Sequence, residues 1–288
     1  MRNFRTIVKI GLLMFISINY GNAQSRPPIW GIAKITFLVS DFQLARDYYG
    51  RFLGFDEAFS YGSSLGKTIS FKVNDRQFLE FIVDKQARDK KRLVSVSFET
   101  ENVELMRQYL KLQGQKVPEK TTIDDAGNEV FLVDDLSGNH IEFIEWNKNG
   151  LHKSSKGMYL SHRRISNRIH HVGLYAEKIV DNDPFYMGIL KFKEIMRYPE
   201  EKSLTATILY LGMVDCIENI EHYSPSDPNF SHPCFLVDDM QETIYTLKER
   251  KISESLGIPM IGKGKRWILN IANPDETRVE FTEAHCVR

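Results

Sequence analysis

Residues 47–55 read DYYGRFLGF, and residues 184–192 read PFYMGILKF. Both nonapeptides hold a pair of adjacent aromatic or apolar residues, a glycine and a final Leu-x-Phe, and they lie 137 positions apart. Nearly the same offset, 138, relates IEF at 141–143 to VEF at 279–281. An offset that stays almost constant along the chain indicates two copies of one domain.

The two predicted copies extend over residues 28–147 and 167–286, and the polar, basic residues 148–166 form the predicted linker. Within each copy, strand-like alternation and helical spacing follow each other twice, as in the strand predicted at 31–40 and the helix at 42–53. Each copy therefore contains two β-α-β-β-β units. We expect an α+β fold of two tandem domains, each a cup-shaped mixed sheet with helices on its outer face.

The first 23 residues have the pattern of an export signal. Arg2, Arg5 and Lys9 precede the short apolar run IGLLMFISI, and Ala23 supplies a small residue for cleavage. A single membrane anchor is the alternative, but the apolar run is short and only its start is charged. We therefore expect a cleaved signal peptide and a periplasmic or secreted protein.

The composition narrows the classes of partner. The 288 residues are 42% hydrophobic, which is enough for a packed core, and 38 basic residues balance 38 acidic ones. A balanced charge gives no electrostatic reason to expect nucleic acid, and no run after the signal is long enough to span a membrane. A small-molecule partner is expected, and a homodimer is compatible with these features.

Three polar side chains interrupt apolar strands in the second copy. His171 alternates with Val172 and Leu174, His232 lies on the face opposite Pro233 and Phe235, and Glu280 stands between Val279 and Phe281; because successive side chains of a strand point to opposite faces, all three are expected inside the cup. Two neutral imidazoles and a carboxylate are a common ligand set for one divalent ion, Fe²⁺, Mn²⁺, Zn²⁺ or Ni²⁺. His170 has the opposite parity and is interpreted as structural.

Four phrases of the second copy resemble the vicinal oxygen chelate superfamily, which includes glyoxalase I, extradiol dioxygenases and metal-free bleomycin-resistance proteins. These phrases are IHHVGL at 169–174, FY…LKF at 185–192, HPCFLVDD at 232–239 and NPD…VEF at 273–281. The resemblance covers both copies and implies metal ligands at His171, His232 and Glu280. Glyoxalase-like members add a fourth ligand, a glutamate, which we assign here to Glu218.

The first copy provides an internal comparison. Its four corresponding positions hold Lys34, Glu80, Ser95 and Glu142, so both histidines are missing. A protonated lysine cannot ligate a metal ion, but it can neutralise two buried carboxylates. We therefore expect a degenerate first domain in which Lys34 replaces the ion.

The resemblance implies chemistry on two neighbouring oxygens of a small substrate, with Glu280 and Glu218 as candidate proton acceptors. Tyr175, Cys234 and Arg266 are candidate pocket residues. Extradiol dioxygenases also need a tyrosine ten residues before the last glutamate and a histidine earlier still, where this chain has Asn270 and Met260. A metal-dependent lyase, isomerase or extradiol-type dioxygenase is therefore one hypothesis, and a metal-free bleomycin-resistance-type binding protein is the alternative.

Overall fold

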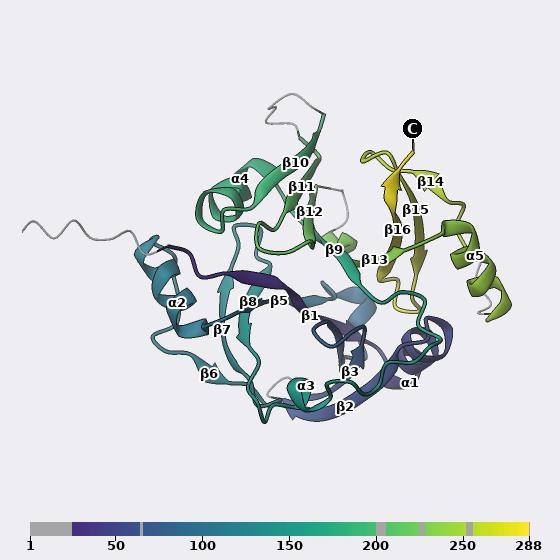
Figure 1. Ribbon diagram of the computed structural model, residues 1–288, viewed down its shortest axis with the longest axis horizontal. Coiled ribbons are helices and arrows are strands. Elements are labelled where there is room, and N and C mark those ends of the chain that lie inside the picture. Colours follow the sequence, from purple (N-terminus) through teal and green to yellow (C-terminus); the bar gives the residue numbers. More distant parts are fainter. Residues whose placement is uncertain (1–24, 64–65, 200–205, 225–227, 252–255, 288) are drawn as a thin grey trace, which may run out of the picture.

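A computed structural model of the protein describes residues 25–63, 66–199, 206–224, 228–251 and 256–287. Two eight-stranded sheets curl beside each other, and the helices lie at their outer faces (Figure 1). The predicted signal peptide at 1–23 lies outside the described residues. Among the described helices, none combines the length and the apolar character that crossing a membrane requires.

The first sheet has the strand order β2-β3-β4-β1-β5-β8-β7-β6. Its strands are β1 (Ile29–Val39), β2 (Asp56–Ser63), β3 (Gly66–Lys72), β4 (Phe78–Val83), β5 (Leu93–Thr100), β6 (Thr122–Ile123), β7 (Glu129–Asp134) and β8 (His140–Glu145). Its helical segments are α1 (Phe42–Ala45), the π-helical η1 (Arg46–Phe52), the 3₁₀ turn η2 (Ala87–Asp89) and α2 (Val103–Leu112), and α3 (Leu151–Ser154) follows in the linker.

The second sheet repeats this arrangement in the order β10-β11-β12-β9-β13-β16-β15-β14. Its strands are β9 (Ile169–Tyr175), β10 (Lys193–Tyr198), β11 (Ile208–Gly212), β12 (Asn219–Tyr223), β13 (His232–Val237), β14 (Met260–Ile261), β15 (Arg266–Ala272) and β16 (Arg278–Cys286). Its helical segments are α4 (Ile179–Asp183), the π-helical η3 (Pro184–Ile189), the 3₁₀ turn η4 (Pro228–Phe230) and α5 (Met240–Glu249).

The pairing confirms the predicted β-α-β-β-β units. In each unit the strand before the helix pairs parallel with the last strand, as β1 does with β4 and β9 with β12. The two units of a sheet meet where β1 pairs antiparallel with β5, and where β9 pairs antiparallel with β13. The α+β fold class and the tandem arrangement are therefore as expected, whereas the domain boundaries stay a prediction.

The helix predicted at 42–53 forms in two parts. It begins as α1, where the Asp41 side chain caps the first turn by accepting a bond from the Gln43 N–H, and it continues as η1. The helix of the second copy is also divided, into α4 and η3, but α4 has no side-chain cap. Both π-helical segments fall on the repeated nonapeptides, so the repeat extends to an uncommon local geometry.

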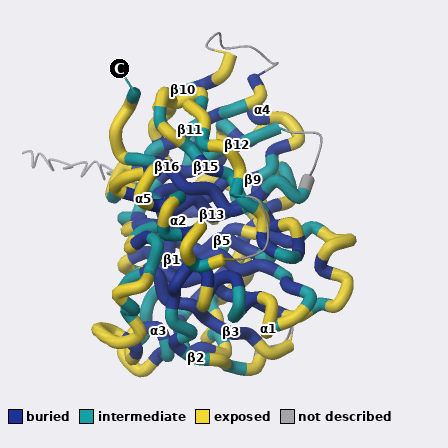
Figure 2. Tube along the Cα trace, turned by 90° about the vertical axis from the view of Figure 1, so that its right-hand side faces the viewer, coloured by how far each residue is buried: buried dark blue, intermediate teal, exposed yellow. Residues whose placement is uncertain are grey.

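Strand alternation turns one face of each central strand toward a hydrophobic core. Ile35 and Phe37 of β1 are fully buried in a hydrophobic core that also includes Phe235 and Phe281 of the second sheet. Residues of both copies meet in this core, where the rings of Phe55 and Phe235 lie 5.1 Å apart. Each such buried side chain contributes about 1.5–3 kcal/mol. Figure 2 shows that the buried residues follow the central strands of the two sheets.

Two equivalent contacts join the copies with approximate twofold symmetry. The buried Tyr186 hydroxyl of η3 donates to Asp135 Oδ2 at 3.0 Å, in the turn between β7 and β8. In the other direction, the turn between β15 and β16 reaches Tyr49 of η1, whose hydroxyl accepts a 3.3 Å bond from Asn273. Tyr49 and Tyr186 are the same position of the repeat, so the repeat also determines how the copies dock.

Candidate metal centre

Four side chains from four strands converge on the inner face of the second sheet. His171 Nε2 lies 3.7 Å from Glu221 Oε2 and 3.5 Å from Glu280 Oε1. His232 Nε2 lies 3.7 Å from the same Glu221 oxygen and 4.0 Å from Glu280 Oε2. Ligand atoms about 2.1 Å from a tetrahedral ion are ~3.4 Å apart, so the spacing of these four groups is close to that of a metal centre.

The hydrogen bonding of these atoms supports the same interpretation. His171 Nε2, His232 Nε2 and Glu221 Oε2 are buried, and in the described part of the chain none of the three has a hydrogen-bond partner. One ligand atom from each of these residues lies within 4.8 Å of the others. Buried polar atoms without partners cost free energy, and a divalent ion between these atoms would satisfy all three.

Gly173 makes the close approach of the four groups possible. It faces His232 across the antiparallel pair of β9 and β13, and it faces Glu221 across the parallel pair of β9 and β12. The His232 ring lies over the glycine so closely that a Cβ there would be 2.1 Å from Cε1. A glycine is therefore required at this point, two residues after His171.

Glu218, which the sequence analysis assigned as the fourth ligand and a proton acceptor, does not lie with the histidines. It precedes β12, and its carboxylate reaches the first copy, where Gln77 donates to Oε1 at 3.3 Å and Oε2 would clash with a Cβ on Gly31. The physical reason is strand parity. β12 begins at Asn219 opposite His171, so the glutamate on the ligand face is Glu221.

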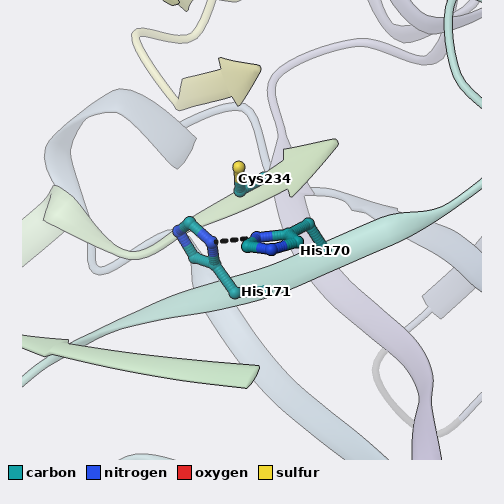
Figure 3. A group of neighbouring side chains, drawn as sticks. All are labelled: His170, His171 and Cys234. Atoms are coloured by element: carbon teal, nitrogen blue, oxygen red, sulfur yellow. Dashed lines mark hydrogen bonds between the residues drawn. The ribbon is translucent and has the colours of Figure 1, made fainter. Parts of the chain in front are cut away.

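His170 is also placed differently from the expectation. The register of β9 against β13 shifts between Ile169 and His171, which leaves His170 as the extra residue of a β-bulge. Its ring therefore turns toward His171, and the two Nδ1 atoms lie 3.0 Å apart (Figure 3). The first sheet has a bulge at the same point, but there the extra residue is Ala33.

Tyr210 of β11 connects the two histidines. Its hydroxyl lies 3.0 Å from His170 Nδ1 and 3.2 Å from His171 Nδ1. Hydrogen bonds at Nδ1 fix the orientation of the His171 ring, so that Nε2 points toward the carboxylates. On the other side of His170, the predicted pocket residue Arg266 donates to Nε2 at 3.0 Å.

Cys234, a second predicted pocket residue, is fully buried and pairs with both His171 and Glu280 along the sheet. With His170 and His171 it forms another group of close ligand atoms (Figure 3). In this second group both Nδ1 atoms already have the Tyr210 hydroxyl within 3.2 Å, whereas the atoms facing Glu221 have no partner among the described residues. The quartet of His171, Glu221, His232 and Glu280 is therefore the better candidate for a metal ion.

Burial sets the charge of the quartet. Burial, followed by the positive charge of Arg278, lowers the pKa of His232 well below its usual range, so this imidazole is neutral and able to ligate. Burial raises the pKa of Glu280. Burial would also raise the pKa of Glu221, but His171 and Arg278 outweigh it and hold the pKa below the ordinary value.

The remaining predicted positions lie around this quartet or away from it. Tyr175 ends β9 on the same face as His171, four residues further along. Asn270 of β15 stands where an extradiol dioxygenase would have its tyrosine. It pairs with Glu280 and accepts a 2.6 Å hydrogen bond from Arg278 Nε. Met260, the position where a dioxygenase histidine was sought, lies in the edge strand β14 and is more than half exposed.

The first sheet has a lysine at the equivalent place. Lys34 Nζ lies 3.3 Å from Glu80, 3.3 Å from Glu142 and 3.6 Å from Asp124. The pairs with the two glutamates are those expected from the sequence, and Asp124 is an additional acid. Ser95 is buried opposite Thr36, as His232 is opposite Gly173. In the first sheet, an ammonium group therefore neutralises the inward-facing carboxylates.

A residue of the predicted linker completes the interior of the first sheet. His152 of α3 is 1% exposed, and its Nε2 lies 2.9 Å from Glu80 Oε1. Its ring stacks on Trp146 at 4.5 Å, and the Tyr61 hydroxyl donates to the other oxygen of Glu80 at 2.8 Å. The inner face of the first sheet is thus filled by the chain itself.

Two dioxygenases and a glyoxalase described as Mn(II)-bound are among the solved structures that are similar to this chain. The 2,3-dioxygenase LapB from Pseudomonas sp. KL28 superposes with a TM-score of 0.70 at 14% identity, over 90% of this chain and 94% of that one. A Mn(II)-bound glyoxalase from Novosphingobium aromaticivorans gives 0.67 at 17% identity, over 89% and 83%. A homoprotocatechuate 2,3-dioxygenase from Arthrobacter globiformis gives 0.67 at 16%, over 92% and 83%.

The chain has the vicinal oxygen chelate fold. No family model matches the sequence, and no curated protein matches it either. At these low identities the structural likeness establishes the fold alone, and the chemistry has to be argued from the side chains.

Glu221 was not among the ligands expected from the sequence, although it lies with the two histidines in this vicinal oxygen chelate fold. The first copy holds the equivalent residue, because Glu80 pairs with Thr36 as Glu221 pairs with Gly173. The two glutamates lie 141 positions apart rather than 137, because the intervening segments differ in length. Only the strand register shows that they are equivalent.

Proposed function

We propose that His171, Glu221, His232 and Glu280 hold one divalent metal ion and that the protein is an enzyme acting on a small molecule with two neighbouring oxygens. The observation that carries this proposal is the convergence of three buried ligand atoms, unpartnered among the described residues, beside a second carboxylate. Two imidazoles and two carboxylates suit Mn²⁺, Fe²⁺, Zn²⁺ or Ni²⁺.

The side chains around the site determine the chemistry that the chain itself contributes. A bound ion would supply Lewis-acid stabilisation of negative charge on the substrate oxygens. Glu221 has a side chain that is 17% exposed, compared with 5% for Glu280, so it lies on the more open side of the quartet. Its carboxylate is therefore the better placed group to accept a proton from a carbon next to a carbonyl. This chemistry corresponds to a glyoxalase-like isomerase or lyase.

A dioxygenase is the second candidate, and one observation favours it. Extradiol chemistry needs a tyrosine and a histidine beside the metal, and Tyr210 and His170 lie within 3.2 Å of His171 Nδ1. These residues come from β11 and from the bulge of β9, not from the expected positions. Oxygen consumption that matches substrate loss would favour this candidate, and unchanged turnover under anaerobic conditions would favour the isomerase or lyase.

Export is a further part of the proposal, and it is supported only by residues 1–23, in which a basic start precedes a short apolar run and a small residue. A mature protein that starts at Gln24 after expression in a bacterium would support it. Retention of the first residues in the purified protein would contradict it.

Elemental analysis of four purified proteins tests the metal site. The wild type should carry about one equivalent of a divalent metal, and the double variant His171→Ala with His232→Ala should carry none. Glu221→Ala should lose most of the metal, whereas Glu218→Ala serves as the matched control and should keep it. Loss in the Glu218 variant with retention in the Glu221 variant would contradict the assignment, and a metal-free wild type would favour a binding protein.

Activity assays then separate the reaction classes. The metal-reconstituted protein is offered 2-oxoaldehydes, catechols and epoxides, each under aerobic and anaerobic conditions. We expect turnover of at least one class that disappears in the Glu221→Ala variant and persists in Glu218→Ala. Turnover that survives loss of the metal would contradict the proposed mechanism.

A further inference from the structure

Two arginines lie at opposite ends of the β15–β16 pair, one beside the quartet and one beside His170. Arg278, the first residue of β16, donates to Glu280 and to Asn270, and its guanidinium lies 4.2 Å from the centre of the Phe230 ring. Arg266, the first residue of β15, lies on the other side, where it donates to His170 Nε2 at 3.0 Å. Arg278 therefore contacts a candidate ligand directly, whereas Arg266 contacts His170, which in turn contacts the candidate ligand His171.

The two arginines differ in how their charge is compensated. Arg278 forms an ion pair with Glu280. For Arg266, no carboxylate in the described part of the chain lies within 4.0 Å, and its hydrogen bond goes to an imidazole ring. A guanidinium group does not lose its proton in a protein. Arg266 is thus a partly buried cation with N–H donors left for an acceptor from outside the chain.

The charges of the site add up to a surplus of positive charge. Glu221 and Glu280 together balance one divalent ion, and the histidines are neutral ligands. Arg266 and Arg278 then leave the filled site positive by two charges. Neutral substrates such as ketones or aldehydes would not compensate this charge, whereas an anionic group would do so through charge-assisted, bidentate hydrogen bonds to a guanidinium.

We propose that the substrate is a small molecule with a carboxylate group, and that Arg266 binds this carboxylate on the side of the site where its guanidinium contacts His170. This inference rests on the proposed metal-dependent function only in calling the bound anion the substrate. The anion site depends on Arg266 and can be measured separately from the metal site.

Binding of pyruvate and of its neutral isostere pyruvamide to the full chain tests the inference. Both ligands are titrated calorimetrically into metal-free and Mn²⁺-loaded protein. We expect pyruvate to bind the wild type about tenfold more tightly than pyruvamide or better. Arg266→Gln should lose this preference, and Arg266→Lys should recover part of it. Lys248→Gln removes a positive charge from the outer helix α5 and should leave both affinities unchanged.

The outcomes separate this inference from the metal proposal. Equal binding of the two ligands, no binding of either, or a preference that persists in a folded Arg266→Gln variant would overturn the inference. If the protein takes up no metal but keeps an Arg266-dependent preference for pyruvate, the metal proposal fails and the anion site stands. Unchanged thermal unfolding of the Arg266 variants shows that the comparison is made on folded protein.

Discussion

Lys34 and His171 occupy the same position in the two copies of the fold. Lys34 pairs with Ser97 across β1 and β5, and His171 pairs with Cys234 across β9 and β13. The Lys34 ammonium lies 3.3 Å from a glutamate on each side, and His171 Nε2 faces the two equivalent glutamates at 3.7 and 3.5 Å. In the first copy a side chain of the protein thus neutralises carboxylates that, in the second, are available to an external cation.

Removal of the Lys34 charge should destabilise the protein strongly. In Lys34→Met, the buried Glu80 and the half-buried Glu142 would be left without their cation, and breaking a buried ion pair such as that of Glu80 costs about 3–5 kcal/mol. Urea denaturation at neutral pH measures the loss. Lys67→Met, at an exposed lysine of β3, is the control and should change the free energy of unfolding by less than about 0.5 kcal/mol. Equal effects of the two substitutions would contradict the ion-pair account.

The wild type and Lys34→Met should also differ in pH dependence. Burial would raise the pKa of Glu80, but Lys34 and the hydrogen bonds from His152 and Tyr61 outweigh it and hold the pKa at about 2, below the ordinary 4.5. In the wild type, this stabilisation is therefore present above pH 4.5 and lost as the pH falls toward 2. Without Lys34, burial raises the pKa of Glu80, so acidification should shrink the loss of unfolding free energy, the deficit, that Lys34→Met shows against the wild type. A deficit that is the same at pH 7 and pH 5 would contradict this explanation.

Gly173→Ala should damage the metal centre more than the fold. The added Cβ would lie 2.1 Å from Cε1 of His232 and 2.4 Å from its Nδ1, so the imidazole has to move away from Glu221. We expect metal affinity to fall at least tenfold, measured by competition with a chelator. Gly188→Ala in η3 is the control, because a methyl group added there would meet no atom within 4 Å beyond its chain neighbours and the backbone of its own helix. Wild-type affinity in Gly173→Ala would show that His232 is not a ligand.

Tyr210→Phe tests whether the hydroxyl orients His171. Removing a partner of a metal-bound histidine typically costs 10- to 100-fold in metal affinity, and we expect a loss of roughly that size. The electron paramagnetic resonance spectrum of the Mn²⁺-loaded variant should also change, which a remote structural effect would not produce. Tyr245→Phe, at an exposed position of α5, should leave both the affinity and the spectrum as in the wild type.

The sequence was sufficient to predict the tandem fold and part of the site, because both depend on strand parity. Val172, Leu174 and Phe235 are large apolar residues that must face a core, and they leave His171 and His232 on the opposite face. Glu221 lies in a strand whose ends are not marked by such residues, since Asn219 and His222 are polar but buried. Without the strand register, the sequence therefore did not show which residues of this strand lie on the same face as the ligands.

The bulge at His170 could not be predicted for a similar reason. It inserts one residue into the pairing of β9 with β13, and no proline or glycine marks it in the sequence. The equivalent Ala33 in the first copy has no polar side chain that would have revealed the same insertion. Local irregularities of a sheet thus determine which residues beyond the ligands themselves reach the site.

A crystal of the full chain grown with Mn²⁺ tests the central claim most directly, through the anomalous diffraction of the ion. We predict one strong peak in the second sheet, about 2.0–2.3 Å from His171 Nε2, His232 Nε2 and oxygens of Glu221 and Glu280, and no peak beside Lys34. A peak at Glu218 or between His170 and Cys234, or no peak at the quartet, would contradict the account.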